Sequence, residues 1–97
     1  MNRVELHTEA DAELFEAAFY LDGARAGYGD KFLDDVSAAF ERIARFPYVV
    51  QRIGRVSKLT LTSFEYDIIY RVEKRRIFVI AIAHHSRRRL YWRSRLR

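Results

Sequence analysis

The segment of residues 58–83 reads KLTLTSFEYDIIYRVEKRRIFVIAIA, and its periodicity decides the fold. Residues 58–62 and 66–72 follow a period of two, which is typical of strands with one buried face. Residues 77–83 are apolar on both sides of the alternation, as expected of a strand in the middle of a sheet. Because only the short connections Ser63-Phe64-Glu65 and Glu73-Lys74-Arg75 separate these runs, the three strands are predicted to form an antiparallel meander.

The chain before this segment has a helical period. Thr8-Glu9-Ala10-Asp11 has the spacing of a helix N-cap followed by acids that suit the helix dipole, so a helix is predicted from about Glu9 to Ala24. A second helix is predicted from about Asp30 to Phe46-Pro47, with apolar residues along one face. Val4 and Leu6 indicate a short first strand that ends at His7.

The predicted order is therefore β-α-α-β-β-β in a single domain of residues 1–97. This is an α+β fold in which a helical hairpin covers one face of an antiparallel sheet. Gly54, between Arg52 and Arg55, is predicted to lie in a loop before the meander. A basic tail or short helix is expected to end the chain.

The net charge of +5 conceals a strong asymmetry along the chain. Residues 1–50 carry five Lys/Arg against ten Asp/Glu, whereas residues 51–97 carry thirteen against three. A basic half of this kind indicates an anionic partner, either nucleic acid or an acidic protein. The alternative is a solvated basic surface with no partner.

Several classes of function lack their sequence signals. The chain has no cysteine and only three histidines, and neighbouring His84 and His85 are expected to point to opposite faces of a strand, so no metal site is predicted. No Gly-rich phosphate loop, Rossmann fingerprint or G-x-S-x-G elbow occurs, and no cofactor is predicted. No apolar run is long enough to cross a membrane and no signal peptide is recognisable, which predicts a cytoplasmic protein.

The C-terminus concentrates the residues that could carry chemistry. Residues 83–97 contain six arginines, two histidines, a tyrosine and the only tryptophan, without one acid. One interpretation is a metal-independent ribonuclease with His84 or His85 as acid/base, Arg87 on the phosphate and Tyr91 assisting. The other is a docking surface in which arginines and Trp92 bind phosphates or an acidic peptide.

Three stretches together resemble the ParE/RelE toxins of bacterial type II toxin–antitoxin modules. Residues 9–14 look like the opening helix of that family, and residues 29–47 are similar to the second helix of its ParE-like members. Residues 63–72, followed by Ala83-His84, the arginines and Tyr91-Trp92, resemble the usual ending "F-P-Y-x-I-x-Y-x-V … A-x-x-H-x-x-R … Y-W". Glu65 and Ser86 depart from that pattern, where proline and arginine are common.

The resemblance implies two alternative activities. ParE-like toxins are taken to poison DNA gyrase without being enzymes, with the C-terminal residues at the active surface. This implies target-binding roles for Arg87, Arg88, Arg89, Tyr91, Trp92 and Arg93. RelE-like toxins cleave messenger RNA on the ribosome, and the residues that could fill their roles are Lys58, Arg71, Arg87 and Tyr91.

The strand at residues 58–62 favours the ParE-like branch. It carries only Lys58 followed by threonines, whereas ribosome-dependent members usually place several basic residues there. A cognate antitoxin, ParD-like or similar, is the implied partner, and Phe15, Phe19 and Leu33 on the hairpin are its candidate contacts. Because Glu65 and Ser86 depart from the pattern, an inactive toxin-like binding module is the third interpretation.

Overall fold

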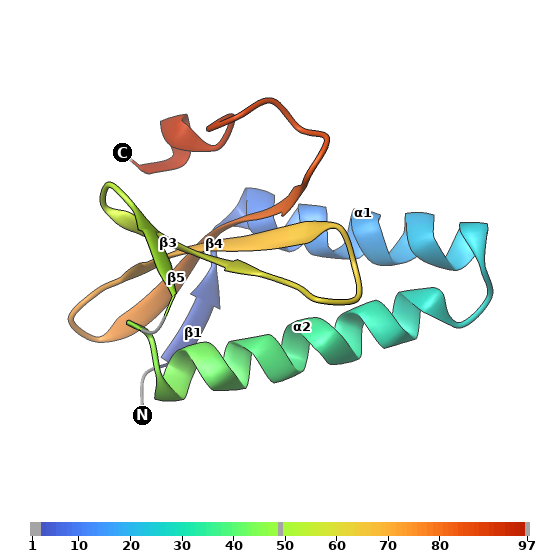
Figure 1. Ribbon diagram of the computed structural model, residues 1–97, viewed down its shortest axis with the longest axis horizontal. Coiled ribbons are helices and arrows are strands. Elements are labelled where there is room, and N and C mark those ends of the chain that lie inside the picture. The colour runs from blue at the N-terminus through green and yellow to red at the C-terminus, as the bar shows by residue number, and fades with distance from the viewer. Residues whose placement is uncertain (1–2, 49, 97) are drawn as a thin grey trace.

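The computed structural model describes residues 3–48 and 50–96. Its elements, in chain order, are β1 (Arg3–Leu6), α1 (Thr8–Ala24), α2 (Tyr28–Arg45), β2 (Gln51–Ile53), β3 (Val56–Thr60), β4 (Tyr66–Val72), β5 (Arg76–His84) and the 3-10 helix η1 (Arg93–Leu96). The five strands form one sheet in the order β1-β5-β4-β3-β2 (Figure 1). The predicted α+β fold, with its hairpin and meander, is confirmed.

Two features of the sheet differ from the sequence-based expectation. β1 pairs in parallel with β5, so the sheet is mixed rather than wholly antiparallel. The long connection that a parallel pair requires runs through the helical hairpin and then through β2, β3 and β4 before the chain returns to β5. The region around Gly54 is a tight turn, with Gly54 at φ 60°, between β3 and the additional strand β2. β2 has only three residues, too few to show a period of two.

The helix starts also lie earlier than expected. The N-cap of α1 is His7 rather than Thr8, because the His7 Nδ1 atom accepts a hydrogen bond of 3.0 Å from the Glu9 amide. α2 begins at Tyr28, two positions before Asp30. Gly29 belongs to this start, since a Cβ atom there would lie 2.6 Å from the Ala18 carbonyl oxygen, closer than atoms tolerate. This glycine allows the two helices to approach each other.

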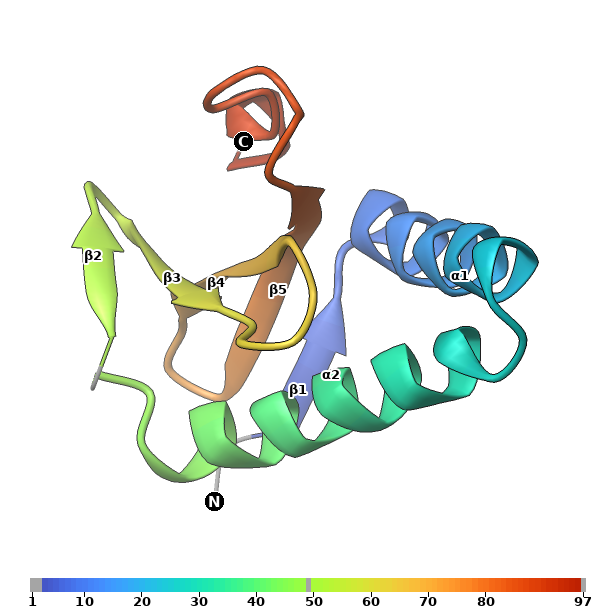
Figure 2. The ribbon, with the colours of Figure 1, turned by 45° about the vertical axis from the view of Figure 1, so that its right-hand side comes forward.

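The two helices cover one face of the sheet, where the larger core lies (Figure 2). Phe32 and Val36 of α2 pack against Ile68, Tyr70 and Ile77 of the strands, and all five are almost fully buried. Each such side chain stabilises the fold by roughly 1.5–3 kcal/mol relative to exposure. Within the described residues no helix is long and apolar enough to cross a membrane.

A second, smaller core lies on the opposite face of the sheet. The register between β4 and β5 shifts at Ile69/Tyr70, so Ile80 of β5 is an extra residue between the two pairs. Such a bulge re-aims side chains, and both Ile80 and Ala81 join the second core. Trp92 of the C-terminal segment is also a buried member of this second core. β5 is therefore covered on both faces, as its apolar sequence predicted.

Candidate functional site

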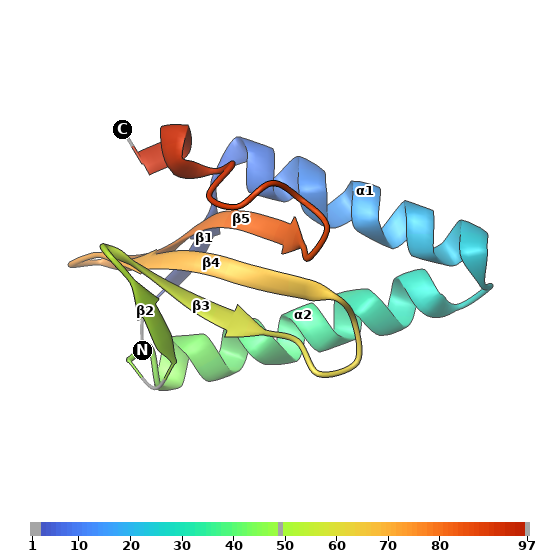
Figure 3. The same ribbon diagram turned by 45° about the horizontal axis from the view of Figure 1, so that its top comes forward.

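The C-terminal segment of residues 85–96, here called the tail, is folded onto the sheet rather than extended (Figure 3). It consists of successive turns, closed by hydrogen bonds from Arg87 N to His84 O and from Tyr91 N to Arg88 O. Leu90 lies at φ 59°, in the left-handed region. Residues other than glycine avoid this region because it costs them roughly 1–2 kcal/mol. Contacts elsewhere in the tail must therefore hold this backbone.

One anchor of the tail is Trp92, whose exposed fraction is 6%. The other is Glu13 of α1, whose carboxylate accepts hydrogen bonds from two tail residues. The Tyr91 hydroxyl donates to Oε2 at 2.7 Å, and the Arg95 guanidinium donates to Oε1 and Oε2 at 2.9 and 3.0 Å. This bidentate geometry is the strong form of an ion pair. The tail is thus fastened to the first helix as well as to the sheet.

Glu13 and Arg95 also complete an edge of the sheet. β1 pairs with β5 only as far as Val79, so the later residues of β5 have β4 on one side and no strand of the described chain on the other. The Ile82 amide donates to Glu13 Oε1 at 3.1 Å, and the Ile80 carbonyl accepts from Arg95 at 3.1 Å. The two side chains satisfy polar groups that burial would otherwise leave unpaired.

These contacts shift the pKa values of both Glu13 and Tyr91. Burial alone would raise the pKa of Glu13, but hydrogen bonds from Arg95, Tyr91 and Ile82 outweigh it and the pKa is lowered. The pKa of Tyr91 is raised, first by burial and then by the hydrogen bond to Glu13. Tyr91 therefore remains a protonated donor directed at Glu13, which does not suit a general base.

A cleft of about 350 Å³ separates the tail from the open part of the sheet. It brings together most of the residues selected from the sequence: Lys58, His84, His85, Arg87, Arg88, Arg89, Tyr91 and Trp92. Arg93 lines a second hollow of about 570 Å³ on the tail, which shares Arg88 and Arg89. Arg88, Arg89 and Arg93 are exposed, and none has an ion-pair partner within residues 3–48 and 50–96.

The two histidines have separate local partners. The His84 ring meets Tyr66 edge-on at 4.9 Å, and its Nδ1 atom accepts from the Ser86 amide at 3.0 Å. His85 Nε2 lies 3.0 Å from Asp67 Oδ1. Among the residues that the structure describes, no three His, Cys, Asp or Glu side chains are grouped so that they could hold a metal ion.

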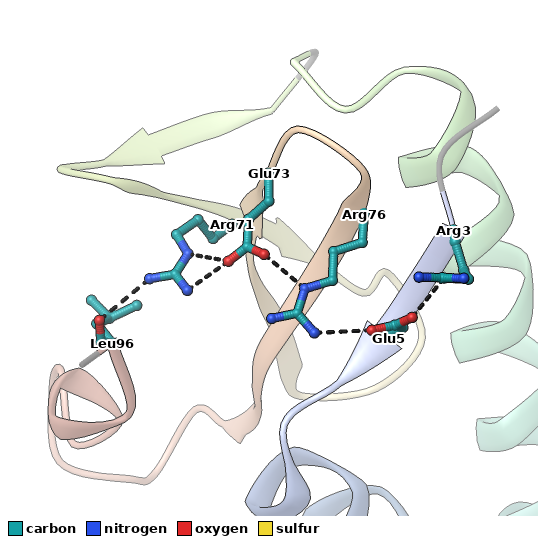
Figure 4. Close-up of polar contacts among 6 residues, drawn as sticks. All are labelled: Arg3, Glu5, Arg71, Glu73, Arg76 and Leu96. Atoms are coloured by element: carbon teal, nitrogen blue, oxygen red, sulfur yellow. Dashed lines mark hydrogen bonds and ion pairs between the residues drawn. The ribbon is translucent and has the colours of Figure 1, made fainter.

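Arg71 lies outside the cleft, in a chain of ion pairs (Figure 4). Its Nε atom donates to Glu73 at 2.8 Å and its Nη1 atom to the Leu96 carbonyl at 3.3 Å. Glu73 also binds Arg76, which continues to Glu5 at 2.9 Å. The hydrogen bond from Arg76 is the main reason why the pKa of Glu73 is lowered. Arg71 therefore secures the end of the tail.

Sequence reasoning counted Arg95 only among the arginines of a docking surface and missed its pairing with Glu13, which fastens the tail. The two residues are 82 positions apart, and neither has a distinctive motif around it. The only available signals were an acid on a predicted helix and an arginine among many. Their pairing depends on α1 and the tail meeting at β5, which the sequence does not specify. Arg97, counted above among the six arginines, lies outside the described residues.

The candidate antitoxin contacts divide into two kinds. Phe15 and Phe19, on α1, have exposed fractions of 58% and 85%. Leu33, on α2, is half-buried and packs against the larger core. Two large aromatic side chains one turn apart on a helix form an apolar patch that a monomer does not need for its own stability.

Comparison with known proteins identifies the class. The sequence model of a family described as the ParE toxin of the type II toxin–antitoxin system parDE matches residues 4–89. This chain therefore belongs to the ParE toxin family. A chain of the chromosomal ParDE toxin–antitoxin system from P. aeruginosa has the same fold, with a TM-score of 0.64 at 19% identity over 87% of this chain and 96% of that one. A comparison with curated proteins found no match.

Proposed function

We propose that this toxin inhibits DNA gyrase without being an enzyme, and that the tail and cleft form its target-binding surface. The observation that carries the proposal is the internal use of two side chains that a ribonuclease would need. Tyr91 donates to Glu13, and Arg71 is held by Glu73 and by the end of the tail. Both polar groups are therefore engaged by partners within the domain.

The six residues proposed for target binding then separate by role. Trp92 is buried, and the Tyr91 ring lies under the guanidinium of Arg87 at 3.9 Å. These aromatic residues position the tail. Arg88, Arg89 and Arg93 are exposed and make no ion pair within the part of the chain that the structure describes, so they supply the contacts with the target. The toxin would act in the cytoplasm, where gyrase is found.

The test is a plasmid cleavage assay. Antitoxin-free, folded toxin is added to gyrase, ATP and supercoiled plasmid, and linear DNA is measured after detergent and protease treatment. We expect linear DNA to increase with toxin concentration. The variant Arg88→Gln/Arg89→Gln/Arg93→Gln should lose most of this activity, whereas Arg25→Gln/Arg42→Gln/Arg45→Gln, which removes the same charge from the helical layer, should keep it.

The opposite outcome has a definite meaning. Lys58, His85 and Arg87 do share the cleft, and these are the residues a ribosome-dependent ribonuclease could still use. If folded toxin yields no linear DNA but cuts messenger RNA in a translation reaction, the ribonuclease assignment replaces gyrase inhibition. Activity in neither assay would point to an inactive binding module.

The family implies a ParD antitoxin as the partner, and we propose that Phe15 and Phe19 contact it. Both are far more exposed than large apolar side chains usually are, and they lie on the helical layer rather than on the tail. Phe15→Ser/Phe19→Ser should weaken antitoxin binding at least tenfold in calorimetry without lowering the free energy of unfolding. Unchanged affinity would assign the antitoxin to another surface. Leu33→Ala, by contrast, should act mainly on stability.

A further inference from the structure

We infer that Arg88, Arg89 and Arg93, here called the arginine face, bind the phosphate backbone of duplex DNA. The inference rests on the proposed role of this surface in target binding and specifies what it touches. Gyrase acts on DNA, so a toxin seated on the enzyme with an exposed cationic surface can contact either the protein or its nucleic acid. Three observations favour the nucleic acid.

The first observation is the charge of the surface. Residues 86–97 contain no acid, and Asp67, the only acid that lines the cleft, lies 3.0 Å from His85. Glu13, the carboxylate that the tail contacts on α1, is already bound by Arg95 and lies 3.8 Å from Arg87. Within residues 3–48 and 50–96, the three exposed arginines therefore have no carboxylate in an ion pair with them. Guanidinium groups bind phosphate in a bidentate geometry, which lysine cannot match.

The second observation concerns the aromatic residues of the tail. Proteins that bind single strands stack exposed bases on aromatic rings. Here the Tyr91 ring lies between the guanidiniums of Arg87 and Arg95, at 3.9 and 5.1 Å, and Trp92 is buried. Neither Tyr91 nor Trp92 is therefore open for stacking, and the remaining ring of the described tail, His85, has its Nε2 atom 3.0 Å from Asp67 Oδ1. Contacts made only by guanidiniums suit a duplex, whose bases are already stacked and whose phosphates are outside.

The third observation is the absence of an apolar centre. Stable protein–protein interfaces usually bury aromatic anchors in the middle of the contact. The large exposed apolar side chains of the described chain, which are Phe15, Phe19, Tyr20, Phe46 and Tyr48, all lie in the helical layer or just after it. The arginine face has guanidiniums without such an anchor, which matches interfaces that are polar and positively charged, as those with DNA are.

The backbone holds the arginine face in place before any ligand binds. Leu90, at φ 59°, turns the chain between Arg89 and Tyr91, and the hollows of about 350 and 570 Å³ flank this turn. Strained residues of this kind persist where the surrounding structure fixes them, often at binding sites. The fixed turn lowers the entropy that the loop loses on binding phosphates.

The test measures binding to DNA without gyrase. Fluorescence anisotropy with a short labelled DNA duplex should show saturable binding, and a fourfold rise in salt should weaken it about 40-fold if three phosphates are contacted. Arg88→Gln/Arg89→Gln/Arg93→Gln should lower affinity at least tenfold and remove most of the salt dependence. Arg25→Gln/Arg42→Gln/Arg45→Gln should do neither. Circular dichroism and thermal unfolding establish that both variants are folded.

A third variant separates geometry from charge. Arg88→Lys/Arg89→Lys/Arg93→Lys keeps the charge, so it should retain the salt dependence while binding a few-fold more weakly. Equal or tighter binding to single-stranded RNA of the same length would overturn the inference. So would equal competition by polyglutamate at the same charge concentration, which would assign the surface to an acidic protein.

The same variants distinguish this inference from the proposed function. If the toxin fails to bind duplex DNA but still produces linear plasmid with gyrase, the inference is wrong and gyrase inhibition stands, through contacts with the protein. If it binds duplex DNA in the predicted manner but produces no linear plasmid, the inference holds and gyrase inhibition is wrong.

Discussion

The two faces of the sheet are held by different kinds of interaction. The helical face buries a continuous apolar core around Phe32, Ile68 and Tyr70. The tail face has a smaller core closed by Trp92, and it relies on the Glu13–Arg95 ion pair, whose side chains are only 13% and 12% exposed. Apolar burial is spread over many residues, whereas the tail depends on two anchors. We therefore expect the face proposed to bind the target to be the one that can be disrupted without unfolding the domain.

The largest effect should come from the helical face. Phe32→Ala removes a fully buried ring that meets Phe64 and Tyr66, and it should lower the free energy of unfolding by about 3–5 kcal/mol. Urea unfolding measures this loss. Phe32→Leu, which keeps most of the volume, should lose much less. If Phe32→Ala lowers the free energy of unfolding by less than Trp92→Ala does, the tail face contributes more to stability than the helical face.

Trp92→Ala should have a smaller effect of about 2–3 kcal/mol, below the usual range for a buried aromatic residue. The tail is terminal and can detach while the helices remain packed on the sheet. Hydrogen exchange should therefore show loss of protection in residues 85–96, with α2 unchanged, and plasmid cleavage should fall. Trp92→Phe should retain both. Loss of protection throughout α2 would show that the two faces unfold together.

Glu13→Gln should cost about 1–2 kcal/mol, because Arg95 loses its charged partner while the remaining amide oxygen can still accept from the Ile82 amide and from one Arg95 nitrogen. The change also has a pH signature. The pKa of Glu13 is lower in the folded protein than in the unfolded chain. Its contribution to stability is therefore fully present above the pKa that Glu13 has in the unfolded chain, and it is lost as the pH falls through the pKa that Glu13 has in the folded protein. Thermal unfolding of the variant should therefore depend less on pH in the acidic range. Glu16→Gln, on the exposed side of α1, is the control.

Glu73→Gln should have the smallest effect, about 0.5 kcal/mol. Arg71 and Glu73 are 27% and 26% exposed, so solvent weakens their ion pair more than it weakens the Glu13–Arg95 pair. The variant releases Arg71 but leaves Trp92 in place, so plasmid cleavage should be retained. Urea unfolding of Glu73→Gln and of the exposed control Glu65→Gln measures the difference in their free energies of unfolding. A cost as large as that of Glu13→Gln would show that the tail has a third anchor.

Prediction from sequence succeeded where periodicity carries the information. The alternation in residues 66–72 and the double-sided apolar run of 77–83 correctly gave neighbouring strands, because burial on a pleated surface imposes that pattern. It failed for β2, which is too short to show a period, and for the parallel pairing of β1, since one strand's sequence does not specify its neighbour's direction. Most of the tail residues selected from the sequence do line one cleft, but their roles in binding or catalysis stay predictions.

The sequence by itself determined the order of the elements apart from β2, the apolar faces that must be buried and the basic character of the C-terminus, because each follows from local composition and period. Only the tertiary structure decided which arginines are free. Arg71 and Arg95 are bound by Glu73 and Glu13, whereas Arg88 and Arg89 are exposed, although all four are equally arginines in the sequence. An ion pair requires two groups within a few ångströms. That proximity arises when α1, β5 and the tail pack together.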